Sequence, residues 1–148
     1  MPTIVIFALD QERYALPLER VERAVRIVEV TPLPKTPAIV CGIVNVRGRL
    51  VPVINLRRRF GLPERNTQLG DQLLIARSAT RTLAMIVDAV SGVAECNAQA
   101  VPGSDYVQGI AKLADGMVLI HDLDSFLSLD EAQSLDQALA ADSPAEAP

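Results

Sequence analysis

The feature that most constrains the fold is a strand–turn–strand–helix unit that occurs twice in the chain. In its first copy, residues 42–60, two apolar runs flank Arg47-Gly48, and Gly48 suits the positive φ of a two-residue hairpin turn. Asn55 then offers an N-cap for a short helix. Pro52 lacks an amide donor, so it predicts an edge position or a bulge in the second strand.

The second copy covers residues 109–127, which repeat the same order 67 positions after residue 42. Asp122 repeats the cap role of Asn55. The pair Asp115-Gly116 predicts the hairpin turn, one residue out of step with the first copy. We therefore expect two similar halves, each built on a hairpin closed by a helical turn. The alternative is two unrelated hairpins that share generic β patterning.

The rest of the chain reads as short strands joined by polar turns. Beyond the two hairpins, strands are expected at residues 3–9, 13–18, 72–76, 82–87 and 90–94, loops at 31–37, 62–70 and 97–107, and a helix at 129–140 with Ser128 as its N-cap. Residues 21–29 fit a strand that follows one helical turn, or a short helix. About ten short strands with regular turn signals favour small closed barrels over one large sheet.

Composition limits the class of protein. The chain of 148 residues is 49% hydrophobic, enough for one domain over residues 1–141, whereas residues 142–148 have too little apolar content to fold and predict a flexible tail. The net charge of −4 argues against a nucleic-acid partner. No run approaches the roughly 18 apolar residues of a membrane span, and no signal peptide is present, so we expect a cytoplasmic protein. Cys41 and Cys96 are expected to be free thiols.

The sequence offers no convergent set of reactive groups. His121 is the only histidine and sits within an apolar strand, which favours a structural histidine, either at a sheet edge or partly buried, over a catalytic one. Asp122 and Asp124 are better explained by capping and solvation than by a metal site. Asp88 follows an apolar run and is expected to end a strand. We therefore predict no catalytic residue, no metal ligand and no cofactor.

Charge distinguishes the two copies. Residues 42–60 carry five arginines and no acid, whereas residues 109–127 carry one lysine and three aspartates, so Arg57 stands where Asp124 stands. Such runs are either solvated faces or the two ends of a bipolar module that docks partners. Arg47 is the sharpest docking candidate, because the turn needs Gly48 but does not need an arginine before it.

Residues 36–60 resemble the signature of the CheW chemotaxis coupling family. The resemblance extends over nearly the whole chain, through Tyr14 and the runs at residues 6–7, 86–90 and 119–123. It implies an all-β fold with minor helix: two intertwined, five-stranded, SH3-like β-barrels that share a hydrophobic seam, with short helices and a C-terminal helix.

The same resemblance implies a non-enzymatic adaptor. CheW-like proteins join the cytoplasmic tip of a methyl-accepting chemoreceptor to a CheA-like histidine kinase through barrel-to-barrel contacts. Carried over by position, the partner-contacting candidates are Val21, Arg23, Gly42, Arg47, Gly48, Val90 and Val93. Arg23 departs from the family pattern, which has an acid there, so the choice of partner stays open. Alternatives are a pathway with a pilus or other output, and a small-molecule binder that uses the groove between the barrels.

Overall fold

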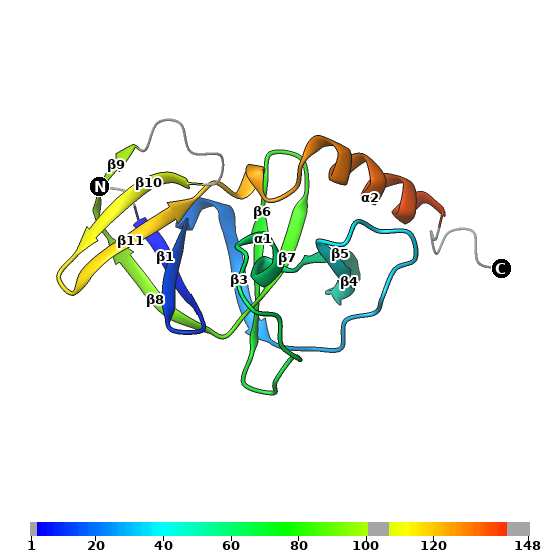
Figure 1. Ribbon diagram of the computed structural model, residues 1–148, viewed down its shortest axis with the longest axis horizontal. Coiled ribbons are helices and arrows are strands. Elements are labelled where there is room, and N and C mark those ends of the chain that lie inside the picture. Colours follow the sequence, from blue (N-terminus) through cyan, green and yellow to red (C-terminus); the bar gives the residue numbers. More distant parts are fainter. Residues whose placement is uncertain (1–2, 101–106, 142–148) are drawn as a thin grey trace.

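The computed structural model describes residues 3–100 and 107–141, which form two β-sheets side by side along the long axis of the molecule (Figure 1). Its strands are β1 (Thr3–Leu9), β2 (Glu12–Pro17), β3 (Val21–Arg26), β4 (Val40–Val46), β5 (Arg49–Ile54), β6 (Gln72–Arg77), β7 (Thr82–Val87), β8 (Ala89–Glu95), β9 (Asn97–Ala100), β10 (Val107–Leu113) and β11 (Gly116–His121). Its helices are the 3-10 turns η1 (Leu18–Arg20) and η2 (Leu123–Ser125) and the α-helices α1 (Leu56–Arg59) and α2 (Leu129–Ala141). The predicted tail, residues 142–148, lies outside the described residues.

The two sheets have the same plan and exchange strands. Sheet A has the order β8-β1-β2-β11-β10-β9, and sheet B has the order β3-β6-β7-β5-β4. The chain leaves β2 in sheet A to add β3 to sheet B, and it leaves β7 in sheet B to add β8 to sheet A. The expected fold of two intertwined, five-stranded units is confirmed, with β9 as an extra strand on sheet A.

Irregularities of strand pairing recur in both sheets. The β4–β5 pairing shifts register between Val40 and Gly42, and the β10–β11 pairing shifts between Val107 and Gly109, at the same offset of 67 residues. Each unit also contains one parallel pair, β5 with β7 and β2 with β11. These matched details confirm the expectation of two similar halves, each ending in a hairpin and a helical turn.

The second hairpin turn lies one residue earlier than predicted. Leu113 pairs with Gly116, so the turn is formed by Ala114 and Asp115. Gly116 instead begins the next strand with φ 138°. The turn is therefore in step with Arg47-Gly48, because register and not the Asp-Gly signal sets its position.

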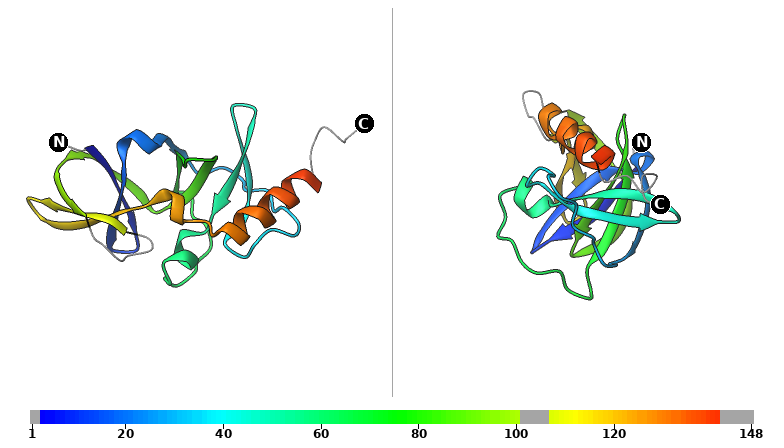
Figure 2. Two further views of the ribbon diagram at one scale, coloured as in Figure 1. Left: turned by 90° about the horizontal axis from the view of Figure 1, so that it is seen from above. Right: turned by 90° about the vertical axis from the view of Figure 1, so that its right-hand side faces the viewer.

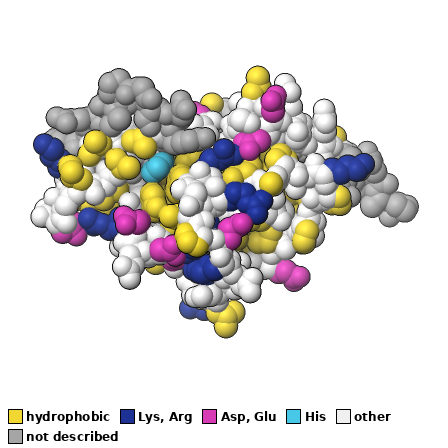
Figure 3. Space-filling model, in the orientation of Figure 1, with side chains coloured by type: hydrophobic (Ala, Val, Ile, Leu, Met, Phe, Trp, Pro, Cys, Tyr) yellow, Lys and Arg dark blue, Asp and Glu magenta, His cyan; other side chains and the backbone are white. Residues whose placement is uncertain are grey.

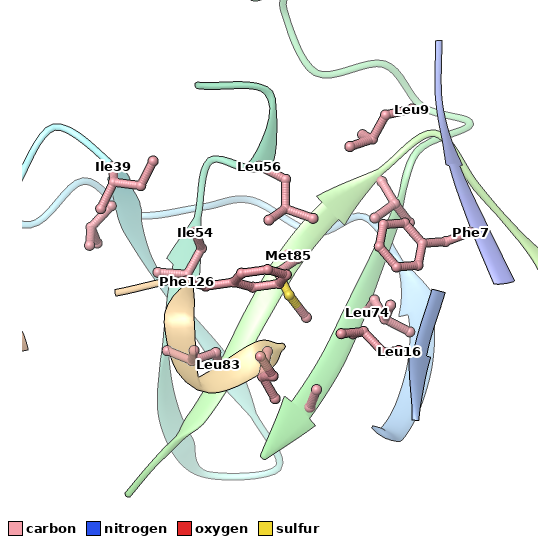
Figure 4. Packing of buried hydrophobic residues seen from close by; sticks show 14 of the residues in the cluster. Phe7, Leu9, Leu16, Ile39, Ile54, Leu56, Leu74, Leu83, Met85 and Phe126 are labelled. Carbon is pink, nitrogen blue, oxygen red and sulfur yellow. The ribbon is translucent and has the colours of Figure 1, made fainter. Parts of the chain in front are cut away.

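The central strands are buried on both faces, as the continuous apolar run of β1 predicts. On β1, Ile4 and Ile6 pack inside sheet A, while Val5 and Phe7 point into a seam between the sheets. Strand β6 repeats this alternation in sheet B. Figure 4 shows side chains from both sheets converging in the seam with those of η2 and its neighbour Phe126.

Three further expectations have clear outcomes. Residues 97–100 do not form a loop, because they pair with β10 as β9; this prediction was wrong. Residues 21–26 form a strand after the turn η1, so the helical alternative was wrong. Helix α2 begins as predicted, with the Ser128 hydroxyl accepting from the Glu131 amide at 3.1 Å and the Glu131 carboxylate accepting from the Ser128 amide at 2.8 Å. In Figure 2 α2 runs along sheet B.

Pro52 lies in an interior strand, so the expected edge position or bulge was wrong. Strand β5 pairs with β7 only through Val53 and Ile54. On the other side Pro52 faces Ile43, whose own amide and carbonyl bond to Thr31 at 2.8 and 2.9 Å. Neither neighbour therefore needs the amide hydrogen that proline lacks.

The loop that leads into β4 passes very close to the β4 backbone at Gly42. A Cβ atom built on Gly42 would lie 2.2 Å from the Thr31 carbonyl oxygen, and its φ is 153°. Only glycine fits this contact, because the nearby atoms belong to the backbone and cannot rotate away.

We expect Gly42→Ala to lower the free energy of unfolding by about 3 kcal/mol, because the added methyl group forces the two backbone segments apart. Gly48→Ala is the matched control: its φ is 86° but its surroundings are open, so it should cost only about 1 kcal/mol. Urea denaturation followed by circular dichroism measures both values. Equal losses would contradict the close-approach explanation.

Candidate partner-binding surface

The seven predicted partner-contacting residues fall into three groups. Arg23, Arg47 and Gly48 lie at one end of sheet B, on β3 and in the β4–β5 turn. Val21 and Val90 occupy matching positions on β3 and β8 and pack against the seam. The remaining two are separate: Gly42 is buried against Thr31, and Val93 is 60% exposed on β8. The structure thus brings some of the predicted residues together, but not into one site.

The β4–β5 turn presents Arg47 to solvent. Arg47 has φ 53° and Gly48 has φ 86°, so both central residues are left-handed, as the twist of a two-residue hairpin requires. The Asn45 side chain accepts a hydrogen bond from the Gly48 amide at 2.8 Å and fixes the turn. Among the described residues, Arg47 forms no ion pair. An exposed arginine is therefore held at the tip of a rigid hairpin.

The other arginines of the first copy are paired within the chain. Arg49 bonds Glu22 at 2.7 Å, Arg58 bonds Glu64 at 2.9 Å, and Arg59 bonds Glu131 on α2. Figure 3 shows basic and acidic side chains side by side across the middle of one face. The five positive charges of residues 42–60 are therefore not a free basic face: among the described residues, only Arg47 of the five forms no ion pair.

Arg57 is the centre of a buried ionic network that the sequence did not reveal. Its side chain is 10% exposed and bonds Asp10 at 2.8 Å and both carboxylate oxygens of Asp88 at 2.8 and 3.0 Å. Arg65 bonds Asp88 at 2.6 Å and Asp71 at 2.8 Å. Asp88 ends β7 as predicted, but its carboxylate also ties the loop of residues 62–70 and the β1–β2 turn to α1.

The network changes the acidity of its carboxyl groups. Partial burial would raise the pKa of Asp88, but hydrogen bonds from Arg57 and from the Asp10 amide outweigh it, so the pKa is lowered. Burial is likewise outweighed at Asp71, whose pKa is lowered by hydrogen bonds from Arg65 and the Gln68 amide. Both groups thus remain ionised in the folded state to lower pH than in the unfolded chain.

Asp124, which stands at the repeat position of Arg57 and carries the opposite charge, has an equivalent structural role. Asp124 on η2 accepts from the Ala79 amide in the β6–β7 turn at 2.7 Å and lies 3.8 Å from Arg20. Arg57 on α1 contacts the equivalent β1–β2 turn through Asp10. Each helical turn therefore closes the seam against the hairpin turn of the other sheet, with the charges reversed. The confirmed cap of η2, Asp122, accepts from the Asp124 amide at 3.0 Å.

His121 belongs to an aromatic cluster at the seam. Its ring centroid lies 4.6 Å from that of Phe60 and 5.4 Å from that of Tyr14, and Phe126 is 6.2 Å away. It is 5% exposed and lies on the interior strand β11, so the edge alternative was wrong and the residue is more fully buried than the other alternative expected. Such a position favours the structural interpretation over a catalytic one.

Comparison with known proteins identifies the family. The model of the CheW-like domain matches residues 3–131. The chain belongs to the CheW-like family. "Chemotaxis protein CheW" of Treponema pallidum is 30% identical over 145 residues, which cover 89% of this chain and 85% of that protein. The crystal structure of the scaffolding protein TtCheW from Thermoanaerobacter tengcongensis superposes with a TM-score of 0.81 at 33% identity, covering 88% of this chain and 96% of the other. "Protein FrzA" of Myxococcus xanthus is 28% identical over 59% of this chain.

The hollows of this CheW-like chain bear on the small-molecule alternative. One of about 450 Å³ lies over sheet A, lined by β1, the β2–η1 junction, β10 and β11, and not by the facing surfaces of the two sheets. One of about 90 Å³ lies beside Arg57 and Asp88. In the described residues, no group of three or more His, Cys, Asp or Glu side chains could hold a metal ion. A third hollow, of about 220 Å³, lies between the β6–β7 turn, η2 and α2, where the seam residues Leu83 and Leu123 line it. A ligand in the inter-barrel groove stays a prediction.

Two other features complete the description of this CheW-like chain. Neither Cys41 nor Cys96 forms a disulfide bond, as expected. Within residues 3–100 and 107–141, no helix has the length and apolarity needed to traverse a bilayer.

We expect Asp88→Asn to lower the free energy of unfolding at pH 7 by about 3 kcal/mol, because Arg57 loses its main partner while it stays buried. Because the pKa of Asp88 is lowered on folding, the wild-type network stabilises the protein above about pH 4 and this contribution is lost as the pH falls further. The variant should therefore lose less stability between pH 7 and pH 3. Urea denaturation at both pH values measures this difference.

The control is Asp115→Asn, which breaks the exposed pair with Arg13 at 3.1 Å, whose side chains are 31% and 72% exposed. It should cost less than about 1 kcal/mol. An Asp88→Asn protein as stable as this control would show that the network contributes little.

Proposed function

We propose that the chain is a non-enzymatic adaptor of chemotaxis-type signal transduction, which couples a chemoreceptor to a CheA-like histidine kinase in the cytoplasm. The observation that carries the proposal is the likeness, over nearly the whole chain, to proteins named as chemotaxis CheW and as a scaffolding protein. A scaffold acts by presenting surfaces, and both sheets of this chain end in rigid hairpins on a well-packed body.

The kinase-binding surface is proposed at the end of sheet B that carries Arg47. The left-handed turn holds this arginine away from the sheet, and its guanidinium is free to pair with a partner because it forms no ion pair among the described residues. The neighbouring arginines are used within the chain instead, so a single side chain dominates the tip of this hairpin.

The receptor-binding surface is proposed along β8 and the seam. Val93 is 60% exposed, although its neighbours in the sheet are apolar. Val21 and Val90 flank the seam on matching strands, and both are half-buried. Exposed and half-buried valines suit the apolar face of an amphipathic receptor helix, which presents side chains spaced three and four residues apart.

The kinase contact is tested with Arg47→Glu and the regulatory domain of a CheA-like kinase from the same organism. We expect affinity, measured by calorimetry, to fall by about tenfold or more, because the substitution reverses the one charge that this hairpin tip presents to a partner. The control Arg26→Glu makes the same charge change on the exposed outer face of β3 and should bind normally. Full binding by a folded Arg47→Glu protein would argue strongly against this surface.

The receptor contact is tested with Val93→Lys. Since Val93 is already exposed, the fold should be retained, while co-sedimentation with receptor-containing membranes should fall severalfold through the cost of burying an ammonium group. Val28→Lys, at a valine that is 48% exposed outside the named strands, is the matched control. Equal loss in both variants would point to a general surface effect.

A further inference from the structure

Most arginines of the described residues form ion pairs within the chain. The exceptions are Arg23, Arg26, Arg47 and Arg77, for which no acidic group of residues 3–100 and 107–141 lies within 4 Å. All of them belong to sheet B: two on β3, one at the end of β6 and one in the β4–β5 turn. Arginines left without partners on one sheet suggest that their partners lie on another molecule.

Three strands of sheet B carry an arginine on the face that lines the core of this sheet. On β6, Leu73 and Ile75 fill the core of sheet B and Arg77 follows in the same row. By the same alternation, Arg49 precedes Val51 on β5, and Arg23 precedes Val25 on β3.

These arginines meet at one end of the sheet. Arg77 pairs in register with Thr82, and the Arg49 guanidinium reaches the Thr82 hydroxyl at 3.5 Å. Arg47 lies in the turn just before Arg49. We call the four arginines Arg23, Arg47, Arg49 and Arg77 the basic rim.

The basic rim already holds one carboxylate. Glu22, at the bulge of β3, bonds Arg49 at 2.7 Å and lies within the electrostatic influence of Arg77 and Arg23. Four arginines against one glutamate leave a net charge of +3 at this end of a chain whose overall charge is −4. The positive end is therefore a local exception to the charge of the whole molecule.

The matching end of sheet A lacks this charge. By strand register, Gly92 stands at the position of Arg23, and Gly116 stands at that of Arg49. What remains there is the pair Arg13–Asp115, which is neutral. Because the two ends share a backbone plan, the basic rim is a property of side chains and is not required by the fold.

We propose that the basic rim is an electrostatic docking surface for an acidic patch on the protein partner of sheet B, so that this partner presents several carboxylates around the Arg47 hairpin. The inference rests on the proposed adaptor function and adds the chemistry of the partner. Guanidinium groups pair carboxylates through two parallel hydrogen bonds, and opposite charges at a rim speed encounter and fix orientation. A nucleic acid is a less favoured partner, because its continuous row of phosphates would be repelled by the net charge of −4 on the whole chain.

The test uses the double variant Arg23→Glu/Arg77→Glu, which reverses two rim charges but leaves Arg47 and the Arg49–Glu22 pair in place. Binding of the CheA-like regulatory domain should weaken at least tenfold in 50 mM KCl. Wild-type affinity should also fall about tenfold between 50 and 500 mM KCl, whereas the residual affinity of the variant should be nearly independent of salt. Circular dichroism and thermal melting check that the variant is folded.

The matched control is Arg26→Glu. Arg26 also has no ion pair with any acidic group that the structure describes, but it pairs in register with Gln72 at the other end of β3 and faces away from the core of sheet B. It should leave both affinity and salt dependence unchanged. Kinase binding that is intact in the double variant, or lost equally in the control, would overturn the basic rim while leaving the adaptor function standing.

A second probe does not depend on the kinase. An octaglutamate peptide added to the labelled protein should shift the NMR amide signals of Gly48 and Thr82 in the wild type and in Arg26→Glu, but not in the double variant. Failure of the kinase to bind wild type, with these shifts present, would reject the proposed function and retain an acid-binding rim. Shifts elsewhere, or tighter binding of an oligonucleotide than of the peptide, would overturn the rim proposal.

Discussion

The structure depends on a hydrophobic seam to which both sheets contribute one face of their central strands. Val5 and Phe7 of β1 meet Leu74 and Ala76 of β6 there, while the alternate side chains of the same strands fill the two separate cores. Burying a side chain such as Phe7 fully stabilises the fold by about 2–3 kcal/mol. Since each central strand serves two cores at once, neither half has a complete interior without the other.

Strand exchange makes this dependence mutual. Strand β3 follows β2 in the chain but completes sheet B, and β8 follows β7 but completes sheet A. The helical turns close the seam electrostatically, Arg57 against the β1–β2 turn and Asp124 against the β6–β7 turn. The oppositely charged residues of the two repeats thus hold the halves together. Few charged side chains remain available to bind other molecules.

The arginines of residues 42–60 divide into those that stabilise the fold and one that is available to bind a partner. Arg57, Arg58 and Arg59 are committed to partners within the chain. Arg47 is not, and it stands at the end of a hairpin whose backbone geometry is fixed independently of the arginine. A rigid body with a small set of uncommitted charges suits an adaptor, because binding then costs little ordering of the surface.

The sequence by itself determined the strands, the repeated hairpin with its caps and the family, because apolar alternation, glycine turns and Asn55 or Asp122 caps are local signals. It did not reveal the Arg57–Asp88–Arg65 network, the contact of Gly42 with Thr31 or the meeting of His121 with Phe60. It also placed the second turn one residue late and assigned β9 to a loop. The ionic network and the His121 contact join segments that are distant in the chain and meet only across the seam, which leaves no local signal. The contact of Gly42, the position of the second turn and the pairing of β9 depend on strand register and on the path of a loop, which residue type alone does not specify.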